Sequence, residues 1–544
     1  MIIRKAIFSL LFISIALDSN SQINRYMVFF KDKINTPYDI ASPQEFLSPR
    51  SIERRTRHGI QVSTSDLPVD PAYVAGLNQQ GAKVMYITKW MNGSLVECTD
   101  SIAQVISSQD YVSSLELVAT GPRPVTPNSF YNGNNLSESG LRKAELANVV
   151  QNNMLGADRM HELGYDGTGI LIAILDAGFI GVNSFSYFSH LFAGDRIIGT
   201  RNFVAGTSDI YVADNHGTEV ISCIAAFDEN SYKGIAFNSS FILCITEDVP
   251  TEYKIEEYNW LFGAEYADSL GADIINSSVG YNTFDSAWMN YSYASMDGNT
   301  AVSTIAADIA ASKGMLCVIS VGNEGNDEWK KLVAPADADS VLSVGAVNSS
   351  MQPVVFSSRG PASDGRIKPE VAALGYMTAI ISPGGSIGYD NGTSFSTPLI
   401  SGLAAGVWQA YPELSNMELI EVIEKGSSNY NDPDTLSGYG IPDFRKIRLL
   451  ITALSEEMPE NLFKVYPNPV QHRKLFIECN KGPVTGMLSV ELIDNSGRQQ
   501  YAESFKIKSG EFKIELDLAG FSSGVYILCL YSSAGDGRVK ILIP

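Results

Sequence analysis

The sequence predicts an α/β protein built on a parallel sheet, with a small α+β unit before it and an all-β module after it. Between about residues 146 and 447, strand-like and helix-like segments alternate, which is typical of an α/β sheet. Short apolar runs in this region, such as residues 170–175 and 241–245, suit parallel strands that are buried on both faces. From residue 463 the apolar residues recur with a period of two, which favours strands with one buried face.

Length and composition exclude several classes of protein. The chain has 544 residues, enough for roughly three or four domains. Hydrophobic residues make up 45% and charged residues 18% of the sequence, which excludes a generally disordered chain. The 39 basic and 60 acidic residues give a formal net charge of −21. An acidic surface repels phosphate backbones, so we expect no nucleic-acid partner.

The first 22 residues have the pattern of a secretory signal peptide. Arg4 and Lys5 form a positive start, residues 6–17 are mostly apolar, and small polar residues follow. A twelve-residue apolar run is shorter than the ~20 residues that a membrane-spanning helix needs. We therefore expect residues 1–22 to direct export and then to be removed.

The cysteines do not predict a disulfide framework. Six in 544 residues are too few to staple a scaffold. Cys223, Cys244, Cys317 and Cys529 each lie inside an apolar run. Because a free cysteine packs as a small hydrophobic residue, we expect these four to be buried thiols.

Residues 23–121 read as a small α+β unit followed by a linker. Strands are expected at 26–30, 83–90, 94–98 and 113–118, and helices at 44–57 and 102–108. Prolines cluster between residues 121 and 128, and residues 129–145 are mostly polar. Proline fixes φ and removes a backbone donor, so this stretch should be an exposed linker.

The carboxyl-terminal segment reads as a small β-sandwich. Alternate residues from Phe512 to Leu518 are apolar, and the residues between them are Lys513, Glu515 and Asp517. Residues 524–530 are apolar throughout, as in a central strand. The segment 461–544 is therefore expected to fold as a separate all-β module.

Four short motifs in the α/β region carry side chains that suit one chemistry. Asp176 ends an apolar strand, and His216 lies in Asn-His-Gly-Thr at the start of an apolar helical run. Asn323 lies in Gly-Asn-Glu-Gly at the end of a second strand. Ser394 lies in Gly-Thr-Ser-Phe-Ser-Thr-Pro, a turn that leads into a helix of small residues. Each residue alone has a plain structural explanation, but their joint occurrence favours a catalytic site.

These residue types fit nucleophilic catalysis by a serine. A serine hydroxyl needs a base within hydrogen-bond reach, and the base needs a third group to fix its tautomer. His216 can serve as the base and Asp176 can orient it. Ser394 would start a helix, where free N–H groups and the helix dipole favour negative charge. The Asn323 amide can donate a hydrogen bond to an oxyanion, with the Ser394 backbone N–H as a second donor.

The order of these residues along the chain separates hydrolase classes. The order here is Asp176, His216, Ser394, whereas α/β-hydrolases run Ser, acid, His and chymotrypsin-type enzymes run His, Asp, Ser. Ser394 also lacks a Gly-x-Ser-x-Gly elbow, because Ser396 stands at the second glycine position. In their order and spacing, over about 300 residues, the four motifs resemble those of subtilisin-like serine proteases.

The resemblance implies a catalytic triad of Asp176, His216 and Ser394, with Asn323 as the oxyanion amide. It implies that residues 151–447 form a subtilisin-like, mostly parallel sheet with helices on both faces. It also implies two segments that line the cleft and pair with an extended peptide, composed of Ser278, Val279, Gly280, Ser320, Val321 and Gly322. One position departs from the family pattern: Ala177 follows the aspartate where Thr or Ser is commoner.

The flanking segments fit the same resemblance. Residues 23–121 resemble the inhibitory propeptide of such proteases, with the activation cleavage expected within the linker 122–150. Residues 461–544 resemble the type A sorting domain of the Bacteroidetes type IX secretion system, on Lys464-Val-Tyr-Pro-Asn-Pro469 and the last strand, residues 539–544. The resemblance implies export by the signal peptide and then passage across the outer membrane, with the type IX secretion machinery as a partner.

We therefore expect a secreted, monomeric serine endopeptidase that acts on proteins or peptides and needs no cofactor for its chemistry. A structural calcium ion at Asp297-Gly-Asn299 is one alternative and a plain Asx turn is the other, so the metal ligands stay unassigned. A catalytically silent surface protein that uses the same fold for binding is the alternative function. For the tail, the alternative is a carbohydrate-binding module.

Overall fold

The computed structural model describes residues 22–124, 146–454, 463–479, 486–494, 499–507, 512–532 and 535–544. The predicted signal peptide, apart from Gln22, and most of the predicted linker lie outside these residues. The chain forms two compact units, Met1–Arg448 and Leu449–Pro544. Among the described helices, none is long and apolar enough to cross a membrane.

The first part of unit 1 is an α+β fold, as the sequence predicts. Its antiparallel sheet has the strand order β2-β3-β1-β4. The strands are β1 (Ile23–Phe30), β2 (Lys83–Thr88), β3 (Gly93–Thr99) and β4 (Val112–Thr120), and the helices are α1 (Pro49–Arg57), α2 (Pro71–Gln79) and α3 (Asp100–Ser107). Alternate residues of β1 point to opposite faces, so Tyr26 and Val28 pack within this fold while Met27 joins the core of the region that follows.

Two details of this fold differ from the sequence prediction. The helix expected from residue 44 begins at Pro49, and a single 3₁₀ turn, Pro43–Glu45, precedes it. Proline lacks an N–H and suits the first helical position, and the Ser48 side chain caps the helix by accepting from the N–H of Ser51 at 3.2 Å. Helix α2 was not predicted; Asp70 and Pro71 supply its cap and first residue.

A seven-stranded parallel sheet forms the centre of unit 1. Its order is β13-β12-β11-β10-β5-β9-β6. The strands are β5 (Leu171–Asp176), β6 (Ile197–Asn202), β9 (Ser240–Ile245), β10 (Ile274–Ser277), β11 (Leu316–Ser320), β12 (Leu342–Val347) and β13 (Val371–Leu374). The strands that follow β5 in sequence, β6 and β9, lie toward one edge of the sheet. The strands that follow β10, which are β11, β12 and β13, lie toward the other edge. The carboxyl ends of β5 and β10 therefore flank a topological switch point, where α/β proteins bind ligands.

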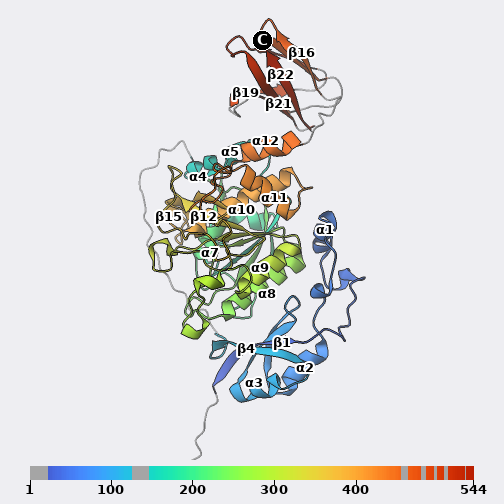
Figure 1. The fold of residues 1–544 in the computed structure, drawn as a ribbon, viewed down its shortest axis with the longest axis vertical. Coiled ribbons are helices and arrows are strands. Elements are labelled where there is room, and N and C mark those ends of the chain that lie inside the picture. The colour runs from blue at the N-terminus through green and yellow to red at the C-terminus, as the bar shows by residue number, and fades with distance from the viewer. Residues whose placement is uncertain are drawn as a thin grey trace, which may run out of the picture. The chain divides into compact units, whose positions relative to one another are not determined.

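Helices cover both faces of this sheet (Figure 1). Helices α8 (Ile255–Leu270) and α9 (Val302–Ser312) lie side by side on one face, and α7 (His216–Ala225) and α10 (Thr393–Ala410) pack together on the other. The other elements of unit 1 are α4 (Val149–Met154), α5 (Ala157–Glu162), α6 (Ser189–Ala193), α11 (Asn416–Lys425), β7 (Phe227–Asp228), β8 (Tyr232–Lys233), β14 (Thr378–Ile381) and β15 (Ile387–Asp390), and α12 (Phe444–Leu454) continues into unit 2.

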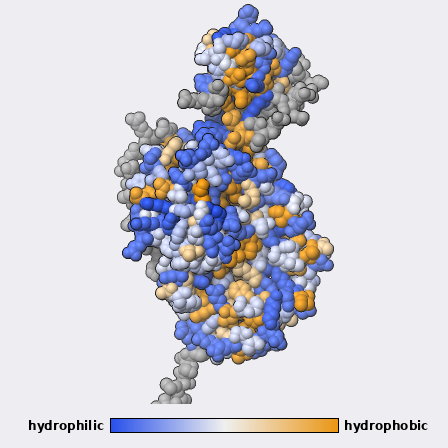
Figure 2. Space-filling model, in the orientation of Figure 1, coloured by the Kyte–Doolittle hydropathy of each residue, from blue (hydrophilic) through white to orange (hydrophobic). Residues whose placement is uncertain are grey.

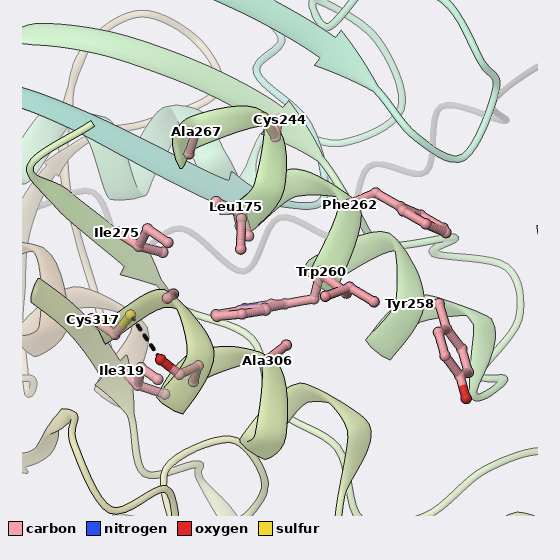
Figure 3. Packing of buried hydrophobic residues seen from close by; sticks show 14 of the residues in the cluster. Leu175, Cys244, Tyr258, Trp260, Phe262, Ala267, Ile275, Ala306, Cys317 and Ile319 are labelled. Atoms are coloured by element: carbon pink, nitrogen blue, oxygen red, sulfur yellow. Dashed lines mark hydrogen bonds between the residues drawn. The ribbon is translucent and has the colours of Figure 1, made fainter. Parts of the chain in front are cut away.

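The core between the sheet and helices α8 and α9 is centred on Trp260 (Figure 3). This indole is fully buried beside Leu175, Ile275 and Ile319, which come from β5, β10 and β11. Its Nε1–H donates to the Ser277 hydroxyl at 2.9 Å, so the polar atom of the ring is satisfied. The packing fixes helix α8 against the strands that end at the switch point.

Unit 2 consists of two antiparallel sheets, β16-β17-β20 and β19-β18-β21-β22. The strands are β16 (Phe463–Gln471), β17 (Lys474–Cys479), β18 (Gly486–Asp494), β19 (Gln499–Ile507), β20 (Lys513–Asp517), β21 (Gly524–Ser532) and β22 (Gly535–Ile543). In β20, Ile514 and Leu516 are buried while Lys513, Glu515 and Asp517 are exposed, as the period of two predicts. The two sheets share one hydrophobic core.

The cysteines agree with the sequence analysis. On the face drawn in Figure 2, hydrophobic and hydrophilic residues both reach the surface. All six cysteines are buried, and the described structure has no disulfide between them. Cys244 on β9 and Cys317 on β11 are separated by β5 and β10.

We expect the fully buried strand β9 to contribute strongly to stability. Ile242→Ala deletes a side chain with no exposed surface and should lower the free energy of unfolding by about 2–5 kcal/mol. Ile198→Ala, on the neighbouring strand β6, removes a side chain that is 48% exposed and should cost less than about 1 kcal/mol. Urea denaturation in a Ser394→Ala background, which prevents self-digestion, measures both values. Equal losses in the two variants would contradict the burial argument.

Candidate active site

Asp176 and His216 form a hydrogen-bonded pair at the carboxyl edge of the sheet. Asp176 is the last residue of β5 and is fully buried, and His216 is the first residue of α7. His216 Nδ1 lies 2.7 Å from Asp176 Oδ1. The same oxygen accepts the backbone N–H of Ala177 at 2.7 Å. The ring nitrogen Nε2 is thereby left as the one that can exchange a proton elsewhere.

The other carboxylate oxygen, Asp176 Oδ2, is buried and has no hydrogen-bond partner within the described structure. A serine or threonine at position 177 could offer a hydroxyl donor next to it, but Ala177 has none. The departure from the family pattern thus has a structural consequence. It leaves one side of the orienting carboxylate without a donor.

The environment of His216 favours its charged form. Burial lowers the pKa of His216, but the negative charge and hydrogen bond of Asp176, with smaller contributions from Glu219 and Asp214, raise that pKa to about 9. The side chain is 32% exposed, so protons can reach it from solvent. Asp214 also fixes the start of α7, because its Oδ1 accepts the backbone N–H of His216 at 2.8 Å.

Ser394 is the second residue of α10, and its side chain is 8% exposed. Pro398 lies in the first turns of this helix and has no N–H to donate to the carbonyl of Ser394, four residues earlier. The hydroxyl of Ser278 donates to that carbonyl instead, at 2.9 Å. In return, the Ser394 hydroxyl donates to the Ser278 carbonyl at 3.3 Å. This reciprocal pair joins the start of α10 to the end of β10.

His216 and Ser394 come from the starts of two helices that pack together. The ring centroids of His216 and Phe395, the residue after Ser394, lie 6.1 Å apart. The described structure has no hydrogen bond between the His216 ring and the Ser394 hydroxyl, because the hydroxyl is turned to Ser278. Catalytic hydrogen bonds are often long in ligand-free structures and tighten when substrate binds.

Asn323 is held so that its amide N–H₂ is free to donate. It follows the carboxyl end of β11 and begins the 3₁₀ turn Glu324–Asn326. Its Oδ1 accepts from the backbone N–H of Thr393 at 2.9 Å and from the Thr393 hydroxyl at 3.1 Å. Because Thr393 directly precedes Ser394, this contact keeps the amide close to the start of α10.

The two segments expected to line the cleft follow the ends of β10 and β11. In the first, Ser278 is buried, Val279 is half-buried and Gly280 is exposed. In the second, Ser320 and Val321 are buried and Gly322 is half-buried. A side chain at Gly280 would meet Val333, and one at Gly322 would meet Glu324, so both glycines permit the local packing. Backbone pairing with a peptide through these residues stays a prediction.

A cavity that the sequence analysis missed lies beside Asn323. It has a volume of about 550 Å³ and is lined by Asn282, Thr283, Glu324, Asp327, Glu328 and Trp329. Burial and the nearby charge of Asp327 raise the pKa of Glu324, and a hydrogen bond from Ser358 at 2.7 Å opposes this rise. Three carboxylates and no cation line the cavity. The only sequence signal was the run of acidic residues after Asn323.

The candidate metal position behaves as a turn. The Oδ1 of Asp297 accepts the backbone N–H of Asn299 at 2.9 Å, which is the geometry of an Asx turn. Its Oδ2 accepts the Thr300 hydroxyl at 2.9 Å. Among the described residues there is no group of three or more His, Cys, Asp or Glu that could hold a metal ion.

Three known protein families match successive parts of this chain. Residues 167–441 match the subtilase family, residues 25–130 match the peptidase S8 propeptide domain of Bacteroidota, and residues 464–544 match the secretion system C-terminal sorting domain. The chain belongs to the subtilase family. The subtilase match includes every element from β5 to α11 and contains Asp176, His216, Asn323 and Ser394.

Two relatives illustrate how far this subtilase resembles others. It is 32% identical to Subtilisin E of Bacillus subtilis (strain 168) over 272 residues, which cover 49% of this chain and 63% of the relative. It is 32% identical to Subtilisin of Bacillus pumilus over 283 residues, which cover 50% of this chain and 91% of the relative. The matched part thus spans less than two thirds of Subtilisin E.

A solved structure shows the same fold. It is a mutant of the epidermin leader peptide processing serine protease of Staphylococcus aureus, and it aligns with a TM-score of 0.54. The two chains are 17% identical, and the alignment covers 78% of this subtilase and 99% of the other chain. The predicted subtilisin-like fold is confirmed, and the sorting domain indicates secretion across the outer membrane.

The pKa of His216 should depend on Asp176. NMR titration of the His216 ring in the Ser394→Ala protein should give a pKa of about 9. In Asp176→Asn the attractive charge is gone and burial dominates, so the pKa should fall below the ordinary value of 6.5. Asp297→Asn, in the Asx turn, should leave it unchanged. A pKa that stays near 9 in Asp176→Asn would show that Asp176 is not its cause.

Proposed function

We propose that this subtilase is a secreted serine endopeptidase that hydrolyses peptide bonds of proteins through an acyl-enzyme on Ser394. The observation that carries this proposal is the 2.7 Å contact between His216 and Asp176. It lies at the switch point of the sheet, beside the start of the helix that bears Ser394. This arrangement supports a base with a fixed tautomer next to a nucleophile.

In the first half of the reaction, His216 Nε2 takes the proton of Ser394 as Oγ bonds to the substrate carbonyl carbon. The carbonyl oxygen becomes an oxyanion, which accepts hydrogen bonds from the Asn323 amide and the Ser394 backbone N–H. The C–N bond then breaks, and His216 returns the proton to the leaving amine. Asp176 stabilises the charged imidazole throughout.

In the second half, water replaces the departed amine. His216 takes a proton from the water as the water oxygen bonds to the acyl carbon. The bond to Ser394 Oγ then breaks, the serine regains its proton from His216, and the product acid leaves. His216 must be neutral at the start of each half, so its raised pKa favours activity at alkaline pH.

The acidic cavity beside Asn323 suggests a substrate preference. We propose that it receives the side chain that precedes the scissile bond, since its lining includes Glu324, the residue that follows the proposed oxyanion residue. Glu324, Asp327 and Glu328 would attract a lysine or arginine there. A neutral side chain would leave three carboxylates close together without a counter-charge.

The flanking domains support a secreted zymogen. The propeptide match supports synthesis as an inactive precursor, with cleavage proposed within residues 122–150. The sorting-domain match supports recognition of residues 461–544 by the type IX secretion machinery. The proposed signal peptide, 1–22, lies almost wholly outside the described residues.

The alternative of a catalytically silent binding protein has less support. Such a protein has no need for an ionised aspartate against a histidine, or for an amide held next to a helix start. In this chain all four side chains are present, and the contacts that orient Asp176, His216 and Asn323 are formed.

Ser394 and Asn323 should differ in how they affect catalysis. In the processed protein, Ser394→Ala should abolish fluorophosphonate labelling and casein cleavage, while Asn323→Ala should lower kcat by about 10²–10³ and retain labelling. Ser396→Ala is a matched control, because that hydroxyl donates within its own helix, to the Thr393 carbonyl at 3.0 Å. If the parent, freed of its propeptide, neither labels nor cleaves, the silent-protein alternative takes precedence.

The cavity should set charge selectivity at the residue before the cut. Paired peptide substrates that differ only by lysine or norleucine at that position give the ratio of kcat/KM values. Glu324→Gln should lower this ratio by about ten-fold, and Asp327→Asn, at an exposed position, by about two- to five-fold. Glu413→Gln, an exposed position outside the cavity, should not change it. A parent that prefers norleucine would refute the assignment.

A further inference from the structure

The propeptide contacts the catalytic region at a surface that lies far from the proposed cleft. Helix α1 packs against Ala272 and Asp273, which precede β10, and against Lys313, which precedes β11. The cleft segments follow the opposite ends of these parallel strands. At about 3.3 Å per residue, the two surfaces are separated by roughly 15 Å along the sheet.

Arg54 is the centre of this contact. Its side chain is 1% exposed, and every nitrogen of its guanidinium donates to the catalytic region. Nε donates to the carbonyl of Lys313 at 3.1 Å, and Nη1 donates to the carbonyl of Ala272. Nη2 donates to Asp268, a fully buried residue of α8. Each nitrogen of the guanidinium thus finds an acceptor, a planar arrangement that an ammonium or a neutral side chain could not reproduce.

Arg55 binds the same carboxylate in a bidentate way. Its Nη1 and Nη2 lie 2.8 and 3.0 Å from the two oxygens of Asp268. Its Nη2 also reaches Asp66 of the propeptide at 2.9 Å. Lys89 adds a third propeptide cation, 3.4 Å from Asp268. One carboxylate of the catalytic region thus holds three cations of the propeptide.

Flanking residues extend the contact on both sides. Arg50 forms an ion pair with Asp273 and donates to the carbonyl of Gly271 at 3.0 Å. His58, just past the end of α1, stacks on Trp408 of α10 with ring centroids 5.6 Å apart. We use the name rear site for four residues of the catalytic region: Asp268, Ala272, Asp273 and Lys313.

We propose that the rear site is an exosite for the arginine-bearing helix α1, and that its buried ion pairs, which lie away from the cleft, set how slowly the cut propeptide leaves the catalytic domain. The contacts described above join α1 directly to the catalytic region, so a cut between residues 125 and 145 removes none of the groups that form them. Because Asp268 and both arginines are buried, salt screens their attraction only weakly. Separation requires all of these charges to be rehydrated together.

The propeptide also contacts the catalytic region at Glu265, and this second contact makes the rear site more effective. Glu265 of α8 accepts the backbone N–H groups of Lys89 and Trp90 at 3.0 and 3.1 Å, in the turn between β2 and β3. When one of these two contacts breaks, the other keeps the propeptide close to the catalytic region, so the broken contact forms again.

The test uses the full chain with Ser394→Ala, which cannot process itself, and a recognition sequence for an added protease within residues 125–145. After cutting and dilution, size-exclusion chromatography and the loss of energy transfer between dyes on the two parts give the dissociation rate. We expect the parent to retain its propeptide. Arg54→Gln combined with Arg55→Gln should release it about 100-fold faster or more, because each change strands buried charge.

Matched variants make the result decisive. Arg57→Gln, on the same helix but 36% exposed and 3.4 Å from Asp273, should change the rate less than about five-fold. Asp268→Asn alters the catalytic side without touching the propeptide and should also speed release. Combining it with the arginine changes should add less than the sum of the separate effects.

Two outcomes would overturn the proposal. The first is a parent that loses its propeptide as fast as the double arginine variant does. The second is Asp268→Asn with an unchanged rate and unchanged thermal unfolding, which decides the matter even if the arginine variants fail to fold. Because every protein in the assay carries Ser394→Ala, the result does not depend on the proposed protease activity.

Discussion

The parallel pairing of β5, β10 and β11 is the constraint on which the rest of the site depends. Parallel strands end at the same edge of a sheet, so the residues that follow them meet there although they lie far apart in the sequence. Asp176, Ser278 and Asn323 reach this edge in that way. The core around Trp260 holds the strands and helix α8 together, which gives these side chains a rigid support.

A proline within a helix completes the geometry. Pro398 deprives the Ser394 carbonyl of its helical donor, and a buried carbonyl without a donor would be costly. The Ser278 hydroxyl supplies the missing hydrogen bond and in doing so ties α10 to β10. A feature that would weaken an ordinary helix here creates a polar link between two parts of the site. Asn323 makes a second link to the same helix start through Thr393.

Charge is distributed in a way that the net value of −21 does not convey. Near the carboxyl ends of the strands, carboxylates line the cavity beside Asn323 with no cation among the lining residues. Near the amino ends, the carboxylate of Asp268 is paired with propeptide cations. The first arrangement suits a positively charged substrate group, and the second suits a partner that carries arginines. The same surplus of acidic residues thus supports two separate kinds of recognition.

Local patterns in the sequence determined the class of each domain, some of the strands and the residues of the candidate site. Alternating and continuous apolar runs gave β1, β5, β9 and β20, and four motifs singled out Asp176, His216, Asn323 and Ser394. Other features needed the tertiary structure. They include the orphaned oxygen of Asp176, the hydroxyl of Ser394 turned to Ser278, the acidic cavity and the rear site. Arg54 and Asp268 are 214 residues apart, and periodicity describes only neighbours on one strand or helix. Hydrophobic spacing is a local property that the sequence displays directly, whereas the pairing of distant polar groups is decided only when the sheet brings its edges and helices together.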